Sequence, residues 1–281
     1  MESSSGTAGG GELGSGFAEV ETVAEGLERS AVFHLVKEIV GFVLYMHHQI
    51  PAILQQLENE FDMLKKESKN LDSVQTQTGL NATSRRRHNG RIREVKQGIK
   101  RMEKLMNSIS TLLSALQLML DETPNIEGVI LVLGGSLIRP QYVYEMFFSR
   151  GRVASESEKY CTKSRAAEAL SRKAIRALVS NGAGAGSYAG PAKLFLLVKA
   201  PATLNLSQHF LPKRDFRYSK KIVPFRLHIK CRTQYQYMDE SHHTSQSNSI
   251  SILDSASNDM IWFQCRHTIK GLASKTTLLD G

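Results

Sequence analysis

The sequence predicts an α+β domain, in which long amphipathic helices come first and strands follow. Over much of residues 30–120, apolar side chains recur at spacings of three and four, the pattern of helices that bury one face. After residue 190 the chain carries short runs rich in β-branched and aromatic residues, which favour strands. Between these regions, residues 129–133 form a continuous apolar run bounded by glycines, which is typical of a strand buried on both faces.

The first 28 residues are predicted to form a disordered tail. They are rich in Gly and Ser and carry almost no bulky side chain before Phe17, so they hold too little apolar surface to offset the entropy cost of ordering. The folded domain is expected to span residues 29–272, and residues 273–281 form a second tail. The first tail holds six acidic side chains, which leaves the rest of the chain more basic (Glu2, Glu12, Glu19, Glu21, Glu25 and Glu28).

Three long helices are predicted within this domain. The first covers residues 30–64 and is interrupted at Pro51, so that its second part is either a kinked extension or a separate helix. A polar loop is expected at residues 68–84, before a second helix over residues 92–120. The third helix covers Ser164–Ser180. It is expected to bury one stripe of small and aliphatic side chains (Ala167, Leu170, Ala174, Ala177 and Leu178).

The remaining elements are shorter. Gly134 and Gly135 are predicted to turn the chain after the buried strand, and Pro140 to open a short helix that includes Glu145. Residues 182–190 are expected to be a flexible, Gly-rich connector. A second flexible loop is expected at residues 239–248, and strands are predicted at Leu194–Lys199, Ile222–Arg232, Ser249–Leu253 and Met260–Cys265.

Four residues are assigned structural roles. Gly134 and Gly135 form the tight turn after the buried strand. The single tryptophan, Trp262, lies in an apolar run with Phe263. Trp262 is therefore predicted to be largely buried among the C-terminal strands.

Composition narrows the class of protein. The longest apolar stretch is far shorter than the roughly eighteen residues that span a bilayer. The N-terminus lacks the basic and apolar regions of a secretory signal. Three widely spaced cysteines, with no CxxC pair, fit a reducing intracellular compartment. The formal net charge of +9 is compatible with nucleic acid, an acidic partner, or solubility alone.

No catalytic or metal-binding motif stands out. Residues 134–136 follow a buried strand, where phosphate loops lie, but no GK[ST] sequence follows and a tight turn explains the glycines. The glycines at 182–190 lie after a helix and before a strand, the reverse of the dinucleotide-binding order. The neighbours His47 and His48 point in different directions, so that pair alone chelates a metal poorly. The sequence therefore predicts neither an enzyme nor a bound cofactor.

A run of cations begins at Arg85, Arg86 and Arg87 and continues to Lys104 along the second helix. One interpretation is a nuclear-localisation signal or a nucleic-acid patch, and the other is an ordinary solvated helix face. The run lacks aromatic side chains for base stacking, which weighs against RNA and single-stranded DNA. The run therefore supports an alternative function, in which the chain is a basic nuclear protein that binds nucleic acid through these cations.

Three separated segments are specific in combination, although each alone is weak. They are Leu44–Pro51; Val129–Gly135 followed by Pro140 and Tyr144-Glu145; and Ile261–Gln264 followed by Lys270-Gly271. In this order they resemble the comet family, adaptors that bind the HORMA-domain checkpoint protein mitotic-arrest-deficient-two. The resemblance runs from about Ser30 to Leu272.

The resemblance implies a HORMA-like fold, with three long helices on a mostly antiparallel sheet and C-terminal strands that wrap the domain. It implies an adaptor that pairs with the closed form of its HORMA partner and presents it to the hexameric pachytene-checkpoint AAA+ ATPase. The partner would be mitotic-arrest-deficient-two or a meiotic chromosome-axis HORMA protein. The adaptor would silence the spindle checkpoint, in the nucleus and, during division, in the cytoplasm and at kinetochores and the spindle.

The same resemblance implies which residues contact the partner. The family's contact surface centres on the third helix, here the outer face of Ser164–Ser180, with help from the first helix. Two residues depart from the family's pattern, since Ile175 stands at an aromatic position and Met46 at a polar one. The residue pattern leaves open whether Ile175 packs in the core or faces a partner. The residues expected at the contact surface are Tyr45, Gln49, Arg172, Ile175, Arg176 and Val179.

Overall fold

The computed structural model describes residues 17–22, 27–74, 82–123, 126–149, 160–186, 190–231 and 259–272. These residues contain the helices α1 (Arg29–Met46), α2 (Leu54–Val74), α3 (Ala82–Glu122) and α4 (Tyr160–Ser180). They also contain the strands β1 (Ala18–Thr22), β2 (Gly128–Gly134), β3 (Pro140–Phe148), β4 (Lys193–Pro201), β5 (Phe210–Lys213), β6 (Phe225–Cys231), β7 (Met260–Cys265) and β8 (Ile269–Lys270).

All eight strands belong to one sheet. Its order is β1-β6-β3-β2-β4-β7-β5, and β8 pairs with β4 beside this path. The strands pair antiparallel, except that β6 runs parallel to both of its neighbours, β1 and β3. The predicted α+β class, with a mostly antiparallel sheet, is confirmed.

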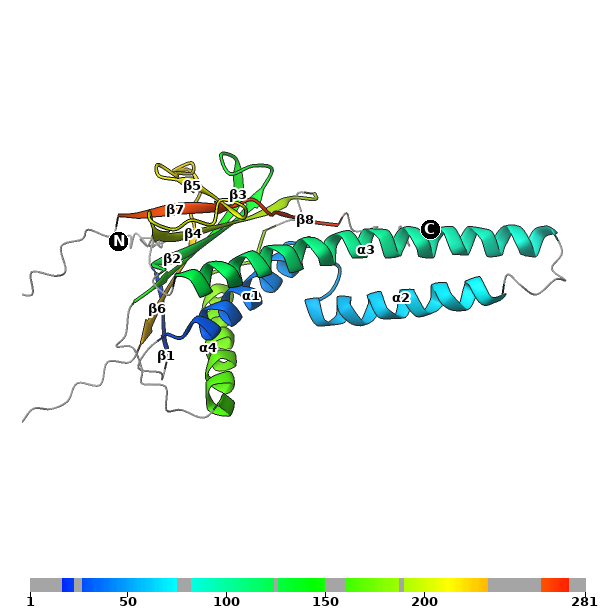
Figure 1. Ribbon diagram of the computed structural model, residues 1–281, viewed down its shortest axis with the longest axis horizontal. Coiled ribbons are helices and arrows are strands. Elements are labelled where there is room, and N and C mark those ends of the chain that lie inside the picture. The colour runs from blue at the N-terminus through cyan, green and yellow to red at the C-terminus, as the bar shows by residue number, and fades with distance from the viewer. Residues whose placement is uncertain are drawn as a thin grey trace, which may run out of the picture.

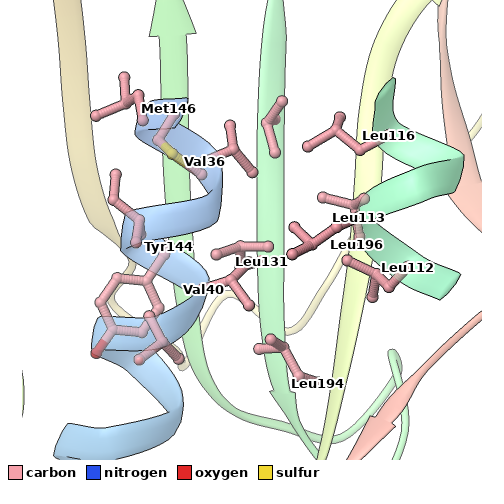
Figure 2. Packing of buried hydrophobic residues seen from close by; sticks show 14 of the residues in the cluster. Val36, Val40, Leu112, Leu113, Leu116, Leu131, Tyr144, Met146, Leu194 and Leu196 are labelled. Atoms are coloured by element: carbon pink, nitrogen blue, oxygen red, sulfur yellow. The ribbon is translucent and has the colours of Figure 1, made fainter. Parts of the chain in front are cut away.

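The helices lie in two groups (Figure 1). Helices α1 and α4 and the C-terminal half of α3 lie against the sheet, whereas α2 runs beside the N-terminal half of α3 and away from the sheet. We call α2 together with residues 82–104 the α2–α3 arm. The main core lies between the sheet and the helices of the first group. Figure 2 shows Val36 and Val40 of α1 and Leu112, Leu113 and Leu116 of α3 directed towards Leu131, Tyr144, Leu194 and Leu196 of the sheet.

The central strand β2 is buried along its whole length, as the apolar run predicted. Its odd-numbered side chains, such as Leu131, face the helices and the main core. Its even-numbered side chains Ile130 and Val132 belong to a second, smaller apolar cluster on the other face of the sheet. Because side chains alternate along a strand, only a continuous apolar run can satisfy both faces.

The first predicted helix is in fact two separate helices. Helix α1 ends at Met46, and α2 begins at Leu54, beyond Pro51. The loop predicted at residues 68–84 is wrong at both ends, since α2 continues to Val74 and α3 already begins at Ala82. The physical reason is that a two-helix arm needs only a narrow apolar seam, so its polar outer faces obscure the helical period.

The short helix predicted after Pro140 is also wrong, because these residues form strand β3. Their side chains alternate, with Tyr142 and Tyr144 directed to the helix face and Glu145 to the opposite face. Proline is tolerated at the first residue of a strand, and β-branched and aromatic residues favour strands. The local composition therefore outweighs the helix-opening preference of Pro140.

The predicted N-terminal disorder is wrong for residues 18–22, which form the edge strand β1. Its register places Val20 opposite Ile229, and Val20 and Thr22 are buried. Lys230 of β6 forms an ion pair with Glu19, and Lys173 Nζ donates to the Glu21 carbonyl oxygen at 3.3 Å. Two buried side chains and a ladder of hydrogen bonds are enough to hold a short strand in place. Residues 1–16 and 23–26 lie outside the described residues.

The later strands follow the prediction in part. Residues 194–199 lie within β4, residues 260–265 form β7, and the strand predicted at 222–232 covers only Phe225–Cys231. The short strands β5 and β8 had no sequence signal, because two to four residues are too few to show alternation. The strand predicted at 249–253, the loop predicted at 239–248 and the tail at 273–281 lie outside the described residues.

The two C-terminal aromatic residues differ in burial. Phe263 is 4% exposed and faces the main core. Trp262 points to the opposite face of the sheet, where it is half-buried against the smaller cluster. Its ring centroid lies 6.4 Å from that of Phe216, in an edge-to-face arrangement. The predicted burial of Trp262 is therefore confirmed in part, since a loop and not the helices covers this face of the sheet.

Candidate functional site

Helix α4 divides into a buried and an exposed face. Its predicted inner stripe is confirmed, since Ala167, Leu170, Ala174 and Leu178 are all buried, and Ala177 packs partly buried against the core. On the opposite face, Arg172 and Arg176 are exposed, and Val179 in the last turn is 50% exposed. Small residues on the inner stripe let the helix lie close to α1 and the sheet, which leaves the longer side chains outside.

Ile175 lies between these two faces. It is half-buried, so it is neither a core residue nor a fully exposed anchor. Arg172 forms an ion pair with Glu168 one turn earlier on the helix. No described carboxylate pairs with Arg176, whose guanidinium stays available to a partner.

The C-terminal ends of α1 and α4 lie together. Helix α4 ends with the Ala183 amide donating to the Leu178 carbonyl, and Gly182 and Gly184 adopt positive φ angles of 80° and 88°. A Cβ atom at Gly184 would lie only 2.5 Å from the terminal methyl of Met46. Met46 is thus used for packing against the end of α4, which accounts for an apolar residue at this position. Its neighbour on α1, Tyr45, is 43% exposed, and so α1 contributes an aromatic side chain close to the end of α4.

Gln49 is not a surface residue, contrary to the prediction. It is 3% exposed, and its amide nitrogen donates to the carbonyl oxygens of His47 at 2.8 Å and Gly190 at 3.2 Å. Its side-chain oxygen accepts a hydrogen bond from the Ala192 amide at 2.7 Å, and its backbone oxygen accepts one from the Leu272 amide at 2.8 Å. Gln49 therefore ties the end of α1 to the start of β4 and to the C-terminal segment.

His47 lies beside Gln49, and from the sequence it was considered only as a poor metal ligand. Its ring stacks on Tyr142, with 3.9 Å between ring centroids, and its Nε2 atom lies 2.6 Å from the Tyr144 hydroxyl oxygen. Burial, with a smaller contribution from the charge of His48, lowers the His47 pKa to about 4. Burial raises the pKa of Tyr144 well above its ordinary value. At neutral pH the phenol is therefore protonated and the imidazole neutral, and the two groups share one hydrogen bond.

The three sequence segments that carry the family resemblance meet at this point. His47 of the first contacts Tyr144 of the second, and Gln49 of the first contacts Gly271 of the third, where a Cβ would lie 2.1 Å from Gln49 Oε1. A Cβ at Gly186 would lie 1.9 Å from the Tyr142 hydroxyl oxygen. Gly184 and Gly186 are therefore needed for close approach, whereas Gly182 and Gly190 meet open space and are favoured by their positive φ angles. We call this cluster of His47, Gln49, Tyr142, Tyr144 and Gly271 the α1 junction.

Glu145 makes its contacts on the opposite face of the sheet. Its carboxylate accepts hydrogen bonds from the Tyr218 hydroxyl at 2.6 Å and from Arg226 Nε at 2.8 Å. Burial, followed by the hydrogen bond to Glu145, raises the pKa of Tyr218, and the Glu145 carboxylate raises the pKa of Arg226. The ion pair joins β3 to β6, and the hydrogen bond from Tyr218 fixes the loop that covers the smaller apolar cluster. Adjacent Tyr144 and Glu145 therefore each anchor a different layer.

The other predicted sites are distributed elsewhere. A Cβ at Gly134 would lie 2.8 Å from the Arg139 carbonyl oxygen, so the turn requires this glycine, whereas Gly135 faces open space. Arg85, Arg86 and Arg87 are exposed in the first turns of α3, at the far end of the arm from the sheet (Figure 1).

Neither a metal cluster nor a membrane helix was found in the part of the chain that the structure describes. No group of three or more His, Cys, Asp or Glu side chains lies close enough together there to hold a metal ion. None of the described helices is both long and apolar enough to span a bilayer. The arrangement that stands out is instead an exposed helix face, held in place by the α1 junction.

Comparison with known families agrees with this picture. The family model described as "p31comet: Mad1 and Cdc20-bound-Mad2 binding" matches residues 23–274. The match includes all three segments of the α1 junction, the whole of α4 and the α2–α3 arm. The HORMA-like fold expected of this family agrees with the helices and the mostly antiparallel sheet. No individual curated protein matches the chain.

Proposed function

This chain belongs to the p31comet family, and we propose that it binds the closed form of a Mad2-type HORMA protein through α4 and the end of α1. The family is described by its binding of Mad1- and Cdc20-bound Mad2, which is the activity of a protein-binding adaptor. The observation that carries the residue-level proposal is the exposed face of α4. It presents Arg172, Arg176 and Val179, and Tyr45 is exposed near the C-terminal end of α1.

These side chains have the chemistry of a protein interface. Tyrosine and arginine are enriched at binding hot spots, because each combines a large apolar surface with a polar end. Tyr45 and Val179 supply apolar area, and the Arg176 guanidinium has no described carboxylate to neutralise it. A partner with an apolar patch bordered by carboxylates would complement this face.

The chain supplies recognition, and we assign the remodelling step to the pachytene-checkpoint AAA+ ATPase. The sequence contains no GK[ST] motif of its own for nucleotide binding. Release of Mad2 from its bound state would silence the spindle checkpoint. A meiotic chromosome-axis HORMA protein is the second candidate partner, and affinity purification from mitotic and meiotic cells distinguishes the two. Nuclear residence, with redistribution to the spindle during division, is expected and is tested by imaging the tagged chain.

The test of the α4 surface is a charge reversal at an exposed position. Arg176→Glu should weaken binding to purified closed Mad2 at least about tenfold, which corresponds to about 1.4 kcal/mol. Because Arg176 is exposed, the substitution should change the chain's free energy of unfolding by only about 0.5 kcal/mol. The matched control is Lys213→Glu, an exposed reversal in strand β5 at the sheet edge, which should leave binding unchanged.

Ile175→Glu provides a second measurement on the same surface. Because Ile175 is half-buried, the substitution should weaken binding and also lower the stability of the free chain by roughly 1 kcal/mol. Undiminished Mad2 binding by both Arg176→Glu and Ile175→Glu would remove α4 from the interface. Equal loss of binding in Lys213→Glu would show that net charge, and not this face, governs the interaction.

A further inference from the structure

The α2–α3 arm carries the strongest concentration of charge in the sequence. Residues 82–104 contain nine Lys or Arg residues against two Glu residues. Figure 1 shows this part of α3 projecting away from the sheet, accompanied only by α2. The proposed Mad2-binding surface on α4 makes no use of the arm.

One side of the arm's α3 segment packs against α2. Val95 and Met102 are buried on this side, and a Cβ at Gly98 would lie 3.8 Å from Leu64 of α2. Arg91 also faces α2, since its Nε and Nη2 atoms donate to Glu67 at 2.9 and 2.7 Å. The charge of Arg91 is therefore used to hold the two helices together.

The opposite side of the helix carries a row of cations. Arg86, Arg93 and Lys100 recur every seven residues, so they project from one side of the helix, opposite to Val95, and Lys104 continues the row. All four side chains are exposed, and no described carboxylate pairs with any of them. We call these four residues the arm stripe. It extends about 27 Å along the helix axis, at about 1.5 Å per residue.

The residues around the stripe favour a nucleic acid over a protein. Gly90, Gln97 and Asn89 lie between its cations, and no exposed large hydrophobic side chain occurs in the described part of residues 82–104. A protein interface needs an apolar centre with few charges, which this surface does not offer. Arg, Lys, Asn and Gln are the side chains that contact phosphate and sugar, and such contacts need no apolar anchor.

The same residues favour a double helix over a single strand. Single-stranded nucleic acids are held by stacking of bases on aromatic side chains, and residues 82–104 contain no Phe, Tyr or Trp. A cationic helix about 10–12 Å across fits the major groove of a duplex, which is about 12 Å wide. A stripe of about 27 Å is long enough to reach phosphates on both backbones of such a groove. The chain offers no base-reading pattern on this face, so binding should be independent of sequence.

We propose that the α2–α3 arm is a second interaction surface, which binds the phosphate backbone of double-stranded nucleic acid through Arg86, Arg93, Lys100 and Lys104. This activity is separate from HORMA binding, because the arm and α4 are different parts of the molecule (Figure 1). A chain with both surfaces can hold its protein partner close to a duplex.

The experiment measures the affinity of the full-length chain for a fluorescent 24-base-pair DNA duplex of arbitrary sequence by anisotropy, at several salt concentrations. The arm variant replaces the four stripe residues by glutamine (R86Q, R93Q, K100Q and K104Q). It should lose at least about tenfold in affinity, and the slope of log affinity against log salt should become shallower by up to about 3.6, at about 0.9 for each of the four charges. The control variant carries the same charge change at four exposed sites outside the arm (K213Q, R214Q, K220Q and K221Q) and should bind as the parent does.

Further probes define the ligand and the independence of the two surfaces. Single-stranded DNA of the same length and a matched RNA duplex should both bind more weakly than the DNA duplex, because the major groove of A-form RNA is too narrow for a helix. The arm variant should retain the circular dichroism spectrum and the Mad2 affinity of the parent. The proposal is overturned if the arm variant binds the duplex as tightly as the parent, if the control variant loses binding equally, or if polyglutamate binds the arm more tightly than the duplex does.

Discussion

The buried imidazole of His47 predicts a specific dependence of stability on pH. Its pKa is lowered to about 4 in the folded chain, chiefly by burial, from an ordinary value of 6.5. The unfolded chain therefore binds a proton at a pH where the folded chain does not. Stability is fully present above about pH 6.5 and is lost as the pH falls towards about 4. A difference of roughly 2.5 units corresponds to about 3 kcal/mol in total, of which about 2 kcal/mol is lost between pH 8 and pH 5.

The substitution that tests this is His47→Gln. The amide does not titrate but can still form a hydrogen bond with the Tyr144 hydroxyl, as the imidazole does at 2.6 Å in the parent. Loss of the stacking on Tyr142 should lower stability at every pH by a similar amount. The part that depends on His47 protonation should disappear, so the stability difference between parent and variant should be smallest near pH 5.

The assay is urea unfolding of the full-length chain from pH 8 to pH 5, followed by the fluorescence of Trp262, the only tryptophan. His34→Gln is the control, since it removes a histidine from the same helix without touching the α1 junction. It should keep the pH dependence of the parent. His267 also has a lowered pKa, through burial and the charge of His209, and it contributes equally to parent and variant. Identical pH profiles for the parent and His47→Gln would refute the reasoning.

Two further predictions concern single contacts. Gly271→Ala should lower the free energy of unfolding by about 1–3 kcal/mol, because the new Cβ would displace the Gln49 amide from buried hydrogen bonds. Gly135→Ala should be nearly neutral, because a Cβ there meets open space. Equal stabilities of the two variants, measured by thermal unfolding, would contradict this. Phe263→Ala should cost about 3–5 kcal/mol and Trp262→Ala clearly less, because only Phe263 faces the main core. A larger cost for Trp262→Ala, measured by denaturant unfolding with circular dichroism, would reverse the assignment of the two faces.

The sequence predicts elements well where one element has a long or complete apolar pattern. Helix α4 has a full inner stripe, and β2 is apolar at every position, so both appear close to their predicted bounds. The predictions fail where stability comes from a distant partner. Strand β1 is held in place by pairing with β6, and α2 by a narrow apolar contact with α3. Neither contact produces a regular apolar spacing in the local sequence. Pro140 misleads because the same residue can open a helix or begin a strand, and only pairing with β2 decides.

The candidate site was predicted in outline and not in detail, for a related reason. The exposed face of α4 follows from the position of its buried stripe, so Arg172, Arg176 and Val179 could be placed outside from the sequence. The burial of Gln49 could not, because a glutamine near a helix end has no periodic partner and its bonds reach Gly190 and Ala192. The pairing of histidine and tyrosine across the fold likewise depends on tertiary contacts alone.

The residues that carry the family resemblance differ from those through which we propose that the chain binds its partner. The segments that carry the resemblance converge on the α1 junction, where His47, Gln49 and Gly271 are buried and fix how α1 meets β3 and the C-terminal segment. Substitutions there disturb folding before they alter any surface. On α4, by contrast, exposed residues can change at little cost to stability, typically within about 0.5 kcal/mol. Ile175 is half-buried, at a position where the resemblance implies an aromatic residue. Its side chain is therefore subject both to packing within the chain and to the proposed contact with a partner. A change there alters both packing and contact, so the identity of the HORMA partner should depend most on this position.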